Sequence, residues 1–216
     1  MRTKHRKKRT SHLRVPLGAP TALNQRWSID FMTEQLERGR YFRILTVIDQ
    51  FSRECPLLWA DHSLTGPKVV ACFDVLAGTR GLPLAITLDN GSEFCSRAMD
   101  VWAYQNGAKL DFIRPRRPSE NGFIESINGR LRDECLNIYV FFDLADAREK
   151  LEAGRQDYND VRPHGSLGKL TPTEFARRAS PLGSSGKRGH DALANVHGQR
   201  HATSSPPRKL ALSTVQ

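Results

Sequence analysis

The order of strand-like and helix-like segments constrains the fold of this chain more than any other feature. Three strand-like segments come first, at residues 26–31, 41–49 and 54–60, and the second of them is rich in β-branched and aromatic residues. The links between them are short, which favours an antiparallel meander. Two further strand-like segments follow, at residues 84–88 and 109–113, and each comes after a segment with helical spacing of its apolar residues.

The helix-like segments cover residues 68–76, residues 97–106, a stretch from near Ser119 past Leu136, and residues 143–158. Gly78 and Gly107 are the predicted stops of the first two, because glycine readily ends a helix. A meander followed by alternating helices and strands predicts an α/β fold with a five-stranded mixed sheet flanked by helices.

The two ends of the chain differ from its middle in charge. The formal net charge is +10, yet residues 30–175 carry 22 acidic and 18 basic residues, whereas residues 1–29 carry eight Lys or Arg and no acid. We therefore predict a basic N-terminal arm at residues 1–25, a core at residues 26–177, and a basic, disordered tail at residues 178–216. Basic ends suit a nucleic-acid partner. The competing interpretation is that they serve only solubility.

Cysteine usage and hydropathy indicate the compartment. The four cysteines (Cys55, Cys72, Cys95 and Cys135) have neither CxxC pairing nor the spacing of metal ligands, so we expect reduced and mostly buried thiols. No apolar run is long enough to span a bilayer, and the basic N-terminus lacks the apolar stretch of a secretion signal. The sequence thus predicts a cytoplasmic protein without a membrane partner.

Three acidic residues carry most of the functional signal. Asp30 lies within the first apolar strand, Asp89 directly follows the fourth, and Glu125, 35 intervening residues later, lies in the predicted helix from Ser119. A buried aspartate is costly unless it is paired or binds a cation, and ligands of α/β sheets collect at strand ends near the switch in strand order. If the fold gathers the three carboxylates, they suit two Mg²⁺ or Mn²⁺ ions for phosphodiester chemistry.

Each acid also has an ordinary structural interpretation. The Asp-Asn-Gly that begins at Asp89 is a common turn sequence. Glu125 belongs to a polar stripe of a helix face, together with Asn121, Asn128 and Arg132, and such a stripe is often only a solvated surface. Next to a basic loop that contains Arg116 and Arg117, the stripe also suits contact with DNA phosphates. Glu93 is interpreted as a neighbour of the site and not as a ligand.

The local sequences identify a family resemblance. The segments that carry it are WSIDFM, GRYFRILTVIDQFSREC, LDNGSEF, FIRPRRPSENGFIESINGRLRDECLN and DYNDVRPHGSLGKLTPTEF. They resemble the integrase-core (DDE) transposases of bacterial insertion sequences, the larger-frame (OrfB-type) proteins related to retroviral integrases. The resemblance covers roughly residues 14–177.

The resemblance implies a ribonuclease H-like fold and a catalytic, metal-binding triad of Asp30, Asp89 and Glu125. It implies that the protein uses Mg²⁺ or Mn²⁺ to cleave DNA 3′ ends and transfer strands during transposition. The implied partners are DNA (element ends and target), further copies of the chain in a homo-oligomer, and the first-frame protein of the element. By the same resemblance, Asn121 and Asn128 match amides of the family motif and are expected to contact DNA.

Two departures from the family pattern lead to an alternative. A helical DNA-binding segment usually precedes the core, whereas only a basic stretch precedes Trp27. Gly154 stands where the family usually has a tryptophan. We therefore expect an N-terminally truncated chain, and the alternative function is a catalytically inactive remnant that retains only DNA binding. A ribonuclease H-like nuclease that hydrolyses DNA without joining it is a further candidate.

Overall fold

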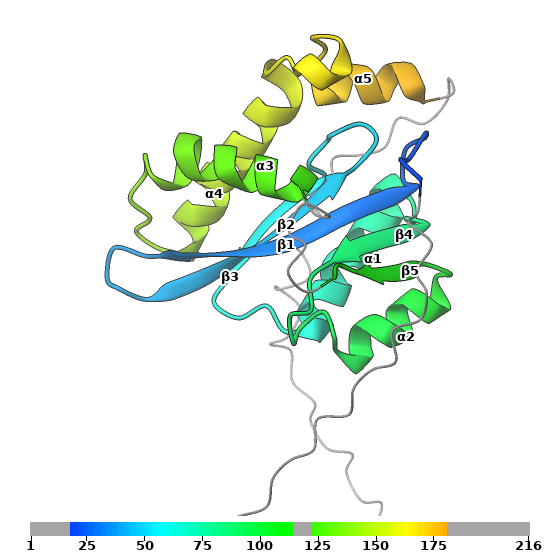
Figure 1. Ribbon diagram of the computed structural model, residues 1–216. Helices are drawn as coiled ribbons and strands as arrows, with labels where there is room; N and C mark the ends of the chain where they lie inside the picture. Colours follow the sequence, from blue (N-terminus) through cyan, green and yellow to red (C-terminus); the bar gives the residue numbers. More distant parts are fainter. Residues whose placement is uncertain (1–17, 115–121, 181–216) are drawn as a thin grey trace, which may run out of the picture.

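A mixed sheet forms the centre of the molecule. The computed structural model describes residues 18–114 and 122–180. The five strands lie in the order β3-β2-β1-β4-β5 (Figure 1). Their bounds are β1 Arg26–Gln35, β2 Tyr41–Asp49, β3 Leu57–Asp61, β4 Ala85–Leu88 and β5 Lys109–Phe112.

The sheet combines antiparallel and parallel pairing, as the order of segments predicted. β1 pairs antiparallel with β2, and β2 with β3, so the first three strands are the expected meander. β4 pairs parallel with β1 and with β5. The switch in strand order therefore lies between β1 and β4, since β1 has an antiparallel neighbour on one side and a parallel one on the other.

Helices cover both faces of the sheet, and each face has its own apolar core. One face packs against α1 (Gly66–Arg80) and α2 (Arg97–Gln105). The other face packs against α3 (Gly122–Leu131) and α4 (Leu144–Gln156), as Figure 1 shows. Trp27 and Ile29 of β1 belong to the first core and Met32 to the second, in keeping with the alternation of side chains along a strand.

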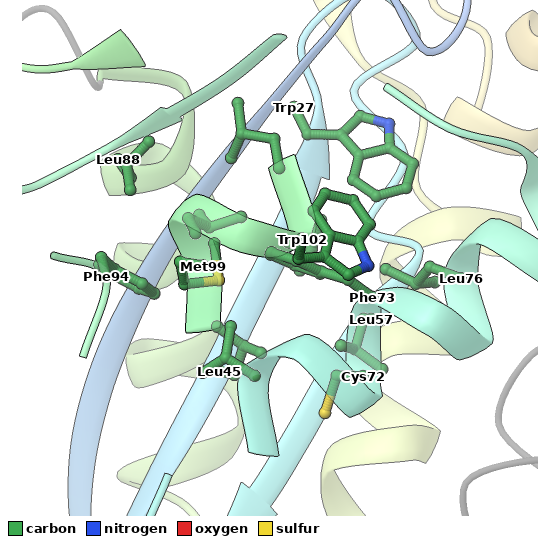
Figure 2. Packing of buried hydrophobic residues seen from close by; sticks show 14 of the residues in the cluster. Trp27, Leu45, Leu57, Cys72, Phe73, Leu76, Leu88, Phe94, Met99 and Trp102 are labelled. Atoms are coloured by element: carbon green, nitrogen blue, oxygen red, sulfur yellow. The ribbon is translucent and has the colours of Figure 1, made fainter. Parts of the chain in front are cut away.

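Aromatic residues fill the core beneath α1 and α2. The Phe73 ring lies 6.4 Å from the Trp27 ring and 5.1 Å from the Trp102 ring, measured between centroids (Figure 2). The Trp102 indole donates a 2.7 Å hydrogen bond to Asp74 Oδ1, so its polar atom is satisfied at the edge of the core. This core anchors β1 and β4, the two strands that carry or precede Asp30 and Asp89.

The helix boundaries differ from the sequence expectations in three places. α1 passes through Gly78 and ends before Gly81, whose φ of 94° suits glycine alone. α3 continues as a π-helical segment, η2 (Arg132–Leu136), and the start expected near Ser119 lies outside the described residues. α4 continues as a second π-helical segment, η3 (Asp157–Val161).

The C-terminal part of the core contains elements that the sequence analysis did not predict. These are a short 3₁₀ segment, η4 (Gly165–Leu167), and a final helix, α5 (Pro172–Ala179). A capping box starts α5, because the Thr171 hydroxyl accepts from the Glu174 amide and the Glu174 carboxylate accepts from the Thr171 amide. Within the described residues, no helix is long and apolar enough to cross a membrane. All four cysteines are free thiols, and Cys95 is the one that is not fully buried.

Candidate active site

Asp30 and Asp89 lie where β1 and β4 stop pairing. The parallel ladder between these strands ends at the pair Ser28–Thr87. Asp30 and Asp89 each follow that last pair by two residues, so their side chains project from the same face of the sheet. This is the face that α3 covers. The point where two neighbouring strands separate is where α/β sheets place their ligands.

Helix α3 brings Glu125 and Asn128 to the same place. The amide Nδ2 of Asn128 donates a 2.9 Å hydrogen bond to Asp30 Oδ2. Glu125 lies three residues earlier, on a neighbouring part of the helix surface, and its side chain is exposed. Asn128, by contrast, is 9% exposed and does not lie on an open polar stripe. Its contact in the structure is with Asp30.

The charges of the three carboxylates act on one another. Burial raises the pKa of Asp30, and the negative charges of Asp89 and Glu125 raise it further. Hydrogen bonds from the Phe31 amide and from Asn128 oppose this rise in the pKa. Within residues 18–114 and 122–180, none of the three carboxylates forms an ion pair with Lys, Arg or His. Three mutually repelling carboxylates without a cationic partner favour the binding of a cation.

The donor chemistry at this place fits a divalent metal ion, although the ligands are not drawn together. Three carboxylates supply the oxygen atoms that Mg²⁺ and Mn²⁺ prefer. Two buried oxygens nearby have no hydrogen-bond partner in the described part of the chain. They are Asn128 Oδ1 and the Oγ1 of Thr46, and Thr46 of β2 pairs with Asp30 of β1. The same part contains no group of three or more His, Cys, Asp or Glu side chains assembled around a common point.

The loop after β4 fixes the direction of Asp89. Asp89 Oδ1 accepts a 2.9 Å hydrogen bond from the Gly91 amide, which closes the expected turn. The loop packs against β1 through Phe94, whose ring stacks on Phe31 with 4.4 Å between centroids. Glu93 forms an ion pair with Arg43 and accepts from the Ser92 hydroxyl. Glu93 is therefore held by Arg43 of β2 and by Ser92 of its own loop.

The remaining predicted site residues divide into two groups. Arg132 is exposed at the start of η2, one helical turn beyond Asn128. Arg116, Arg117 and Asn121 lie outside the described residues. Sequence reasoning missed Gln50, which is buried near the end of β2, and Arg53, which packs on α3. Nothing in their local sequence distinguishes them from ordinary turn residues, because their contacts with β1, β4 and α3 are distant in the sequence.

Comparisons with known proteins find integrase-core proteins and proteins of bacterial insertion elements. Two family profiles described as "Integrase core domain" match residues 20–118 and 106–172. An uncharacterized 31.7 kDa protein of insertion element IS407 from Burkholderia multivorans is 47% identical over 165 residues, which are 76% of this chain and 60% of that protein. The InsD transposase of IS2 elements in Escherichia coli is 26% identical over 76% of this chain and 57% of its own length. This chain thus spans about three fifths of these relatives.

A solved structure supports the fold. The catalytic core domain of HTLV-2 integrase, in complex with magnesium, aligns with a TM-score of 0.54 and 16% sequence identity over 72% of this chain and 97% of that domain. A likeness at this low sequence identity establishes the fold alone, which is ribonuclease H-like.

Proposed function

Because this chain belongs to the integrase core domain family, we propose that it is a DDE transposase of a bacterial insertion sequence. Its activity would be metal-dependent cleavage of DNA 3′ ends and transfer of the resulting strands to a target. The observation that carries the proposal is the junction of β1, β4 and α3, where the negative charges of Asp89 and Glu125 act on Asp30. Among the described residues, none of the three carboxylates forms an ion pair with a cationic side chain.

In this proposal the three carboxylates hold the metal and Asn128 holds Asp30. Mg²⁺ or Mn²⁺, bound as two ions, would supply activation of the attacking oxygen and stabilisation of the leaving oxygen. Two hydrogen bonds orient Asp30, because its Oδ2 accepts from Asn128 and its Oδ1 accepts from the Phe31 amide at 2.8 Å. The Gly91 amide performs the same role for Asp89. The chain provides no covalent nucleophile in this scheme.

DNA contacts are proposed for the exposed surface around the carboxylates. Arg132 presents its guanidinium on the face of α3 and η2 that Glu125 shares, so it suits a phosphate of the bound strand. Arg116, Arg117 and Asn121 are proposed for the same surface. The further partners that we propose are additional copies of this chain and the first-frame protein of the element. HTLV-2 integrase cores have been solved in dimeric and trimeric forms.

A catalytically inactive, DNA-binding remnant is the second candidate. It is favoured by one observation, namely that the described carboxylates do not surround a common point. It predicts that the chain binds DNA but never cleaves it.

The experiment that separates the candidates is a cleavage and joining assay with duplex DNA from the flanks of its gene, in Mg²⁺ and in Mn²⁺. A transposase yields free 3′-hydroxyl ends and joined products, and a hydrolytic nuclease yields the ends alone. Asp89→Asn removes one carboxylate charge and should abolish both products, whereas Asp100→Asn, on the exposed side of α2, should keep them. Cleavage that survives Asp89→Asn would refute the proposal.

A further inference from the structure

The loop between β2 and β3 contains a buried side chain that joins two strands of the sheet. Gln50 is 4% exposed. Its amide Nε2 donates to Ser28 Oγ at 2.7 Å and to Thr87 Oγ1 at 3.2 Å. Ser28 belongs to β1 and Thr87 to β4, so one side chain from a third segment connects the two strands beneath the site.

The position of this connection is specific. Ser28 and Thr87 form the last pair of the β1–β4 ladder, and the strands stop pairing beyond it. Asp30 lies two residues beyond Ser28 in β1, and Asp89, directly after β4, lies two residues beyond Thr87. By joining the two hydroxyls, Gln50 therefore sets the distance between β1 and β4 directly before the two carboxylates.

The same loop also contacts the helix that carries Glu125. The Arg53 guanidinium lies 3.6 Å from the centroid of the Phe123 ring, and Phe123 precedes Glu125 by two residues in α3. Arg53 Nη1 also donates to the backbone carbonyl of Gln50. Gln50 and Arg53 thus form one connected unit that reaches β1, β4 and α3.

The loop is itself held by hydrogen bonds to a buried carboxylate, as a positioning element requires. Asp49 is fully buried, and its Oδ1 accepts from the amides of Phe51 and Ser52 at 2.9 and 3.1 Å. Its Oδ2 accepts from the Asn24 amide at 2.8 Å. Arg53 adopts a φ of 62°, a left-handed conformation that is uncommon for a residue with a side chain and that the surrounding contacts maintain.

We propose that the β2–β3 loop positions the acidic site, with Gln50 fixing the distance between Asp30 and Asp89 and Arg53 fixing the N-terminal half of α3 against them. The inference rests on the proposed function, because it assigns these residues a role in metal binding by the three carboxylates. Neither Gln50 nor Arg53 reaches the carboxylates directly, so both are positioning residues.

The test measures Mn²⁺ binding to the full-length chain by electron paramagnetic resonance, without DNA. Gln50→Met keeps the length of the side chain and removes its donor, and we expect Mn²⁺ affinity to fall about tenfold or more, as for other groups that orient metal ligands. Thr87→Val keeps the volume and removes one acceptor, and should weaken binding in the same direction. Arg53→Met should also weaken it.

Two controls separate positioning from general damage. Gln35→Met removes a glutamine whose amide donates to the Gly39 carbonyl, in the turn between β1 and β2, away from the site. Leu76→Ala lowers stability from within the core on the opposite face of the sheet. Both should keep the Mn²⁺ affinity of the unsubstituted chain, even where the thermal midpoint falls as far as in Gln50→Met.

The outcomes separate this proposal from the proposed function. If Gln50→Met binds Mn²⁺ as tightly as Gln35→Met, or if Leu76→Ala weakens binding equally, the positioning role is wrong. Should Gln50→Met fail to fold, Thr87→Val decides the question. An unsubstituted chain that binds no Mn²⁺ also overturns the positioning role. Absence of DNA cleavage by a chain whose Mn²⁺ binding responds to Gln50 would instead refute the proposed function alone.

Discussion

At the scale of single residues, the direction of Asp89 depends on a glycine. The Gly91 amide donates to Asp89 Oδ1, and a Cβ built on Gly91 would lie 2.9 Å from that same oxygen. A carbon atom this close to a carboxylate oxygen forces the carboxylate or the turn to move. The Asp-Asn-Gly turn, which has an ordinary structural interpretation, therefore also orients the Asp89 carboxylate.

Gly91→Ala should weaken Mn²⁺ binding and slow DNA cleavage while the fold is retained, because the displaced group is the Asp89 carboxylate. We expect an effect of about tenfold in metal affinity, the size typical of a lost orienting contact. Gly78→Ala is the matched control, since a Cβ at Gly78 in α1 meets no atom within 4 Å. Equal metal affinities for the two variants, measured by titration with Mn²⁺, would contradict the prediction.

At the scale of elements, sequence patterns predicted the strands and helices better than the contacts between them. The strand at residues 41–49 and the antiparallel meander are confirmed. They could be predicted because a segment rich in β-branched and aromatic residues favours a strand, and short links favour antiparallel pairing of neighbours. α5 was not predicted, although Thr171, Pro172 and Glu174 contain its start signals. The helix is short, and its apolar positions are too few to show a period by themselves.

For the candidate site too, the sequence indicated individual residues better than the contacts between them. The local motifs singled out Asp30, Asp89 and Glu125. It could not reveal that Asn128 turns inward to Asp30, because position 128 lies at the border between the polar and apolar faces of α3. Likewise, the link from Gln50 to Ser28 and Thr87 joins residues 22 and 37 positions apart, and no local pattern encodes such a contact.

Helix α4 contains the departure from the family pattern at Gly154. Beside this glycine lies a cavity of about 430 Å³, whose lining includes Leu131, Cys135 and Tyr158. A Cβ at Gly154 would meet Cys135 Sγ at 3.7 Å and Leu131 Cδ1 at 3.8 Å, which are ordinary van der Waals distances. The absent side chain therefore leaves α4 and α3 less closely packed than they could be.

Gly154→Ala should stabilise the protein. We expect a gain of about 1 kcal/mol in the free energy of unfolding, because alanine favours the helix interior and the added methyl group fits without displacement. Urea denaturation followed by circular dichroism measures the change. Gly81→Ala is the opposite control, since its φ of 94° makes a side chain unfavourable there. A Gly154→Ala variant that is no more stable than the unsubstituted chain would contradict the prediction.

At the scale of the whole molecule, the C-terminal elements pack at the end of α4, where α5 contacts η3 (Figure 1), and a buried histidine joins them. His164 is 7% exposed, its ring packs edge-on against Tyr158 at 4.9 Å, and its backbone pairs with Leu170. Its Nε2 atom has no hydrogen-bond partner among the described residues. Arg130, Arg53 and Arg162 lie close enough to act on its charge, so three separate elements surround one imidazole.

The pKa of this histidine makes the stability of the fold depend on pH. Burial lowers the pKa of His164 below its ordinary value of 6.5, and the positive charges of Arg130, Arg53 and Arg162 lower it further, against an opposing hydrogen bond to the Tyr158 backbone. The unfolded chain therefore binds this proton at a higher pH than the folded chain does. The contribution of His164 to stability is present above pH 6.5 and is lost as the pH falls through the folded-state pKa.

We accordingly expect the free energy of unfolding to fall between pH 7 and pH 5.5, and expect His164→Gln to reduce that fall, because glutamine carries no titrating proton. The measurement is urea denaturation at both pH values, and the comparison uses the difference between them, which cancels any loss of packing common to both. His62→Gln, near the opposite end of the sheet, should keep the pH dependence of the unsubstituted chain. If His164→Gln retains the full difference, the imidazole is not the group that couples the C-terminal elements to pH, and the acidic residues of the core must account for the loss of stability instead.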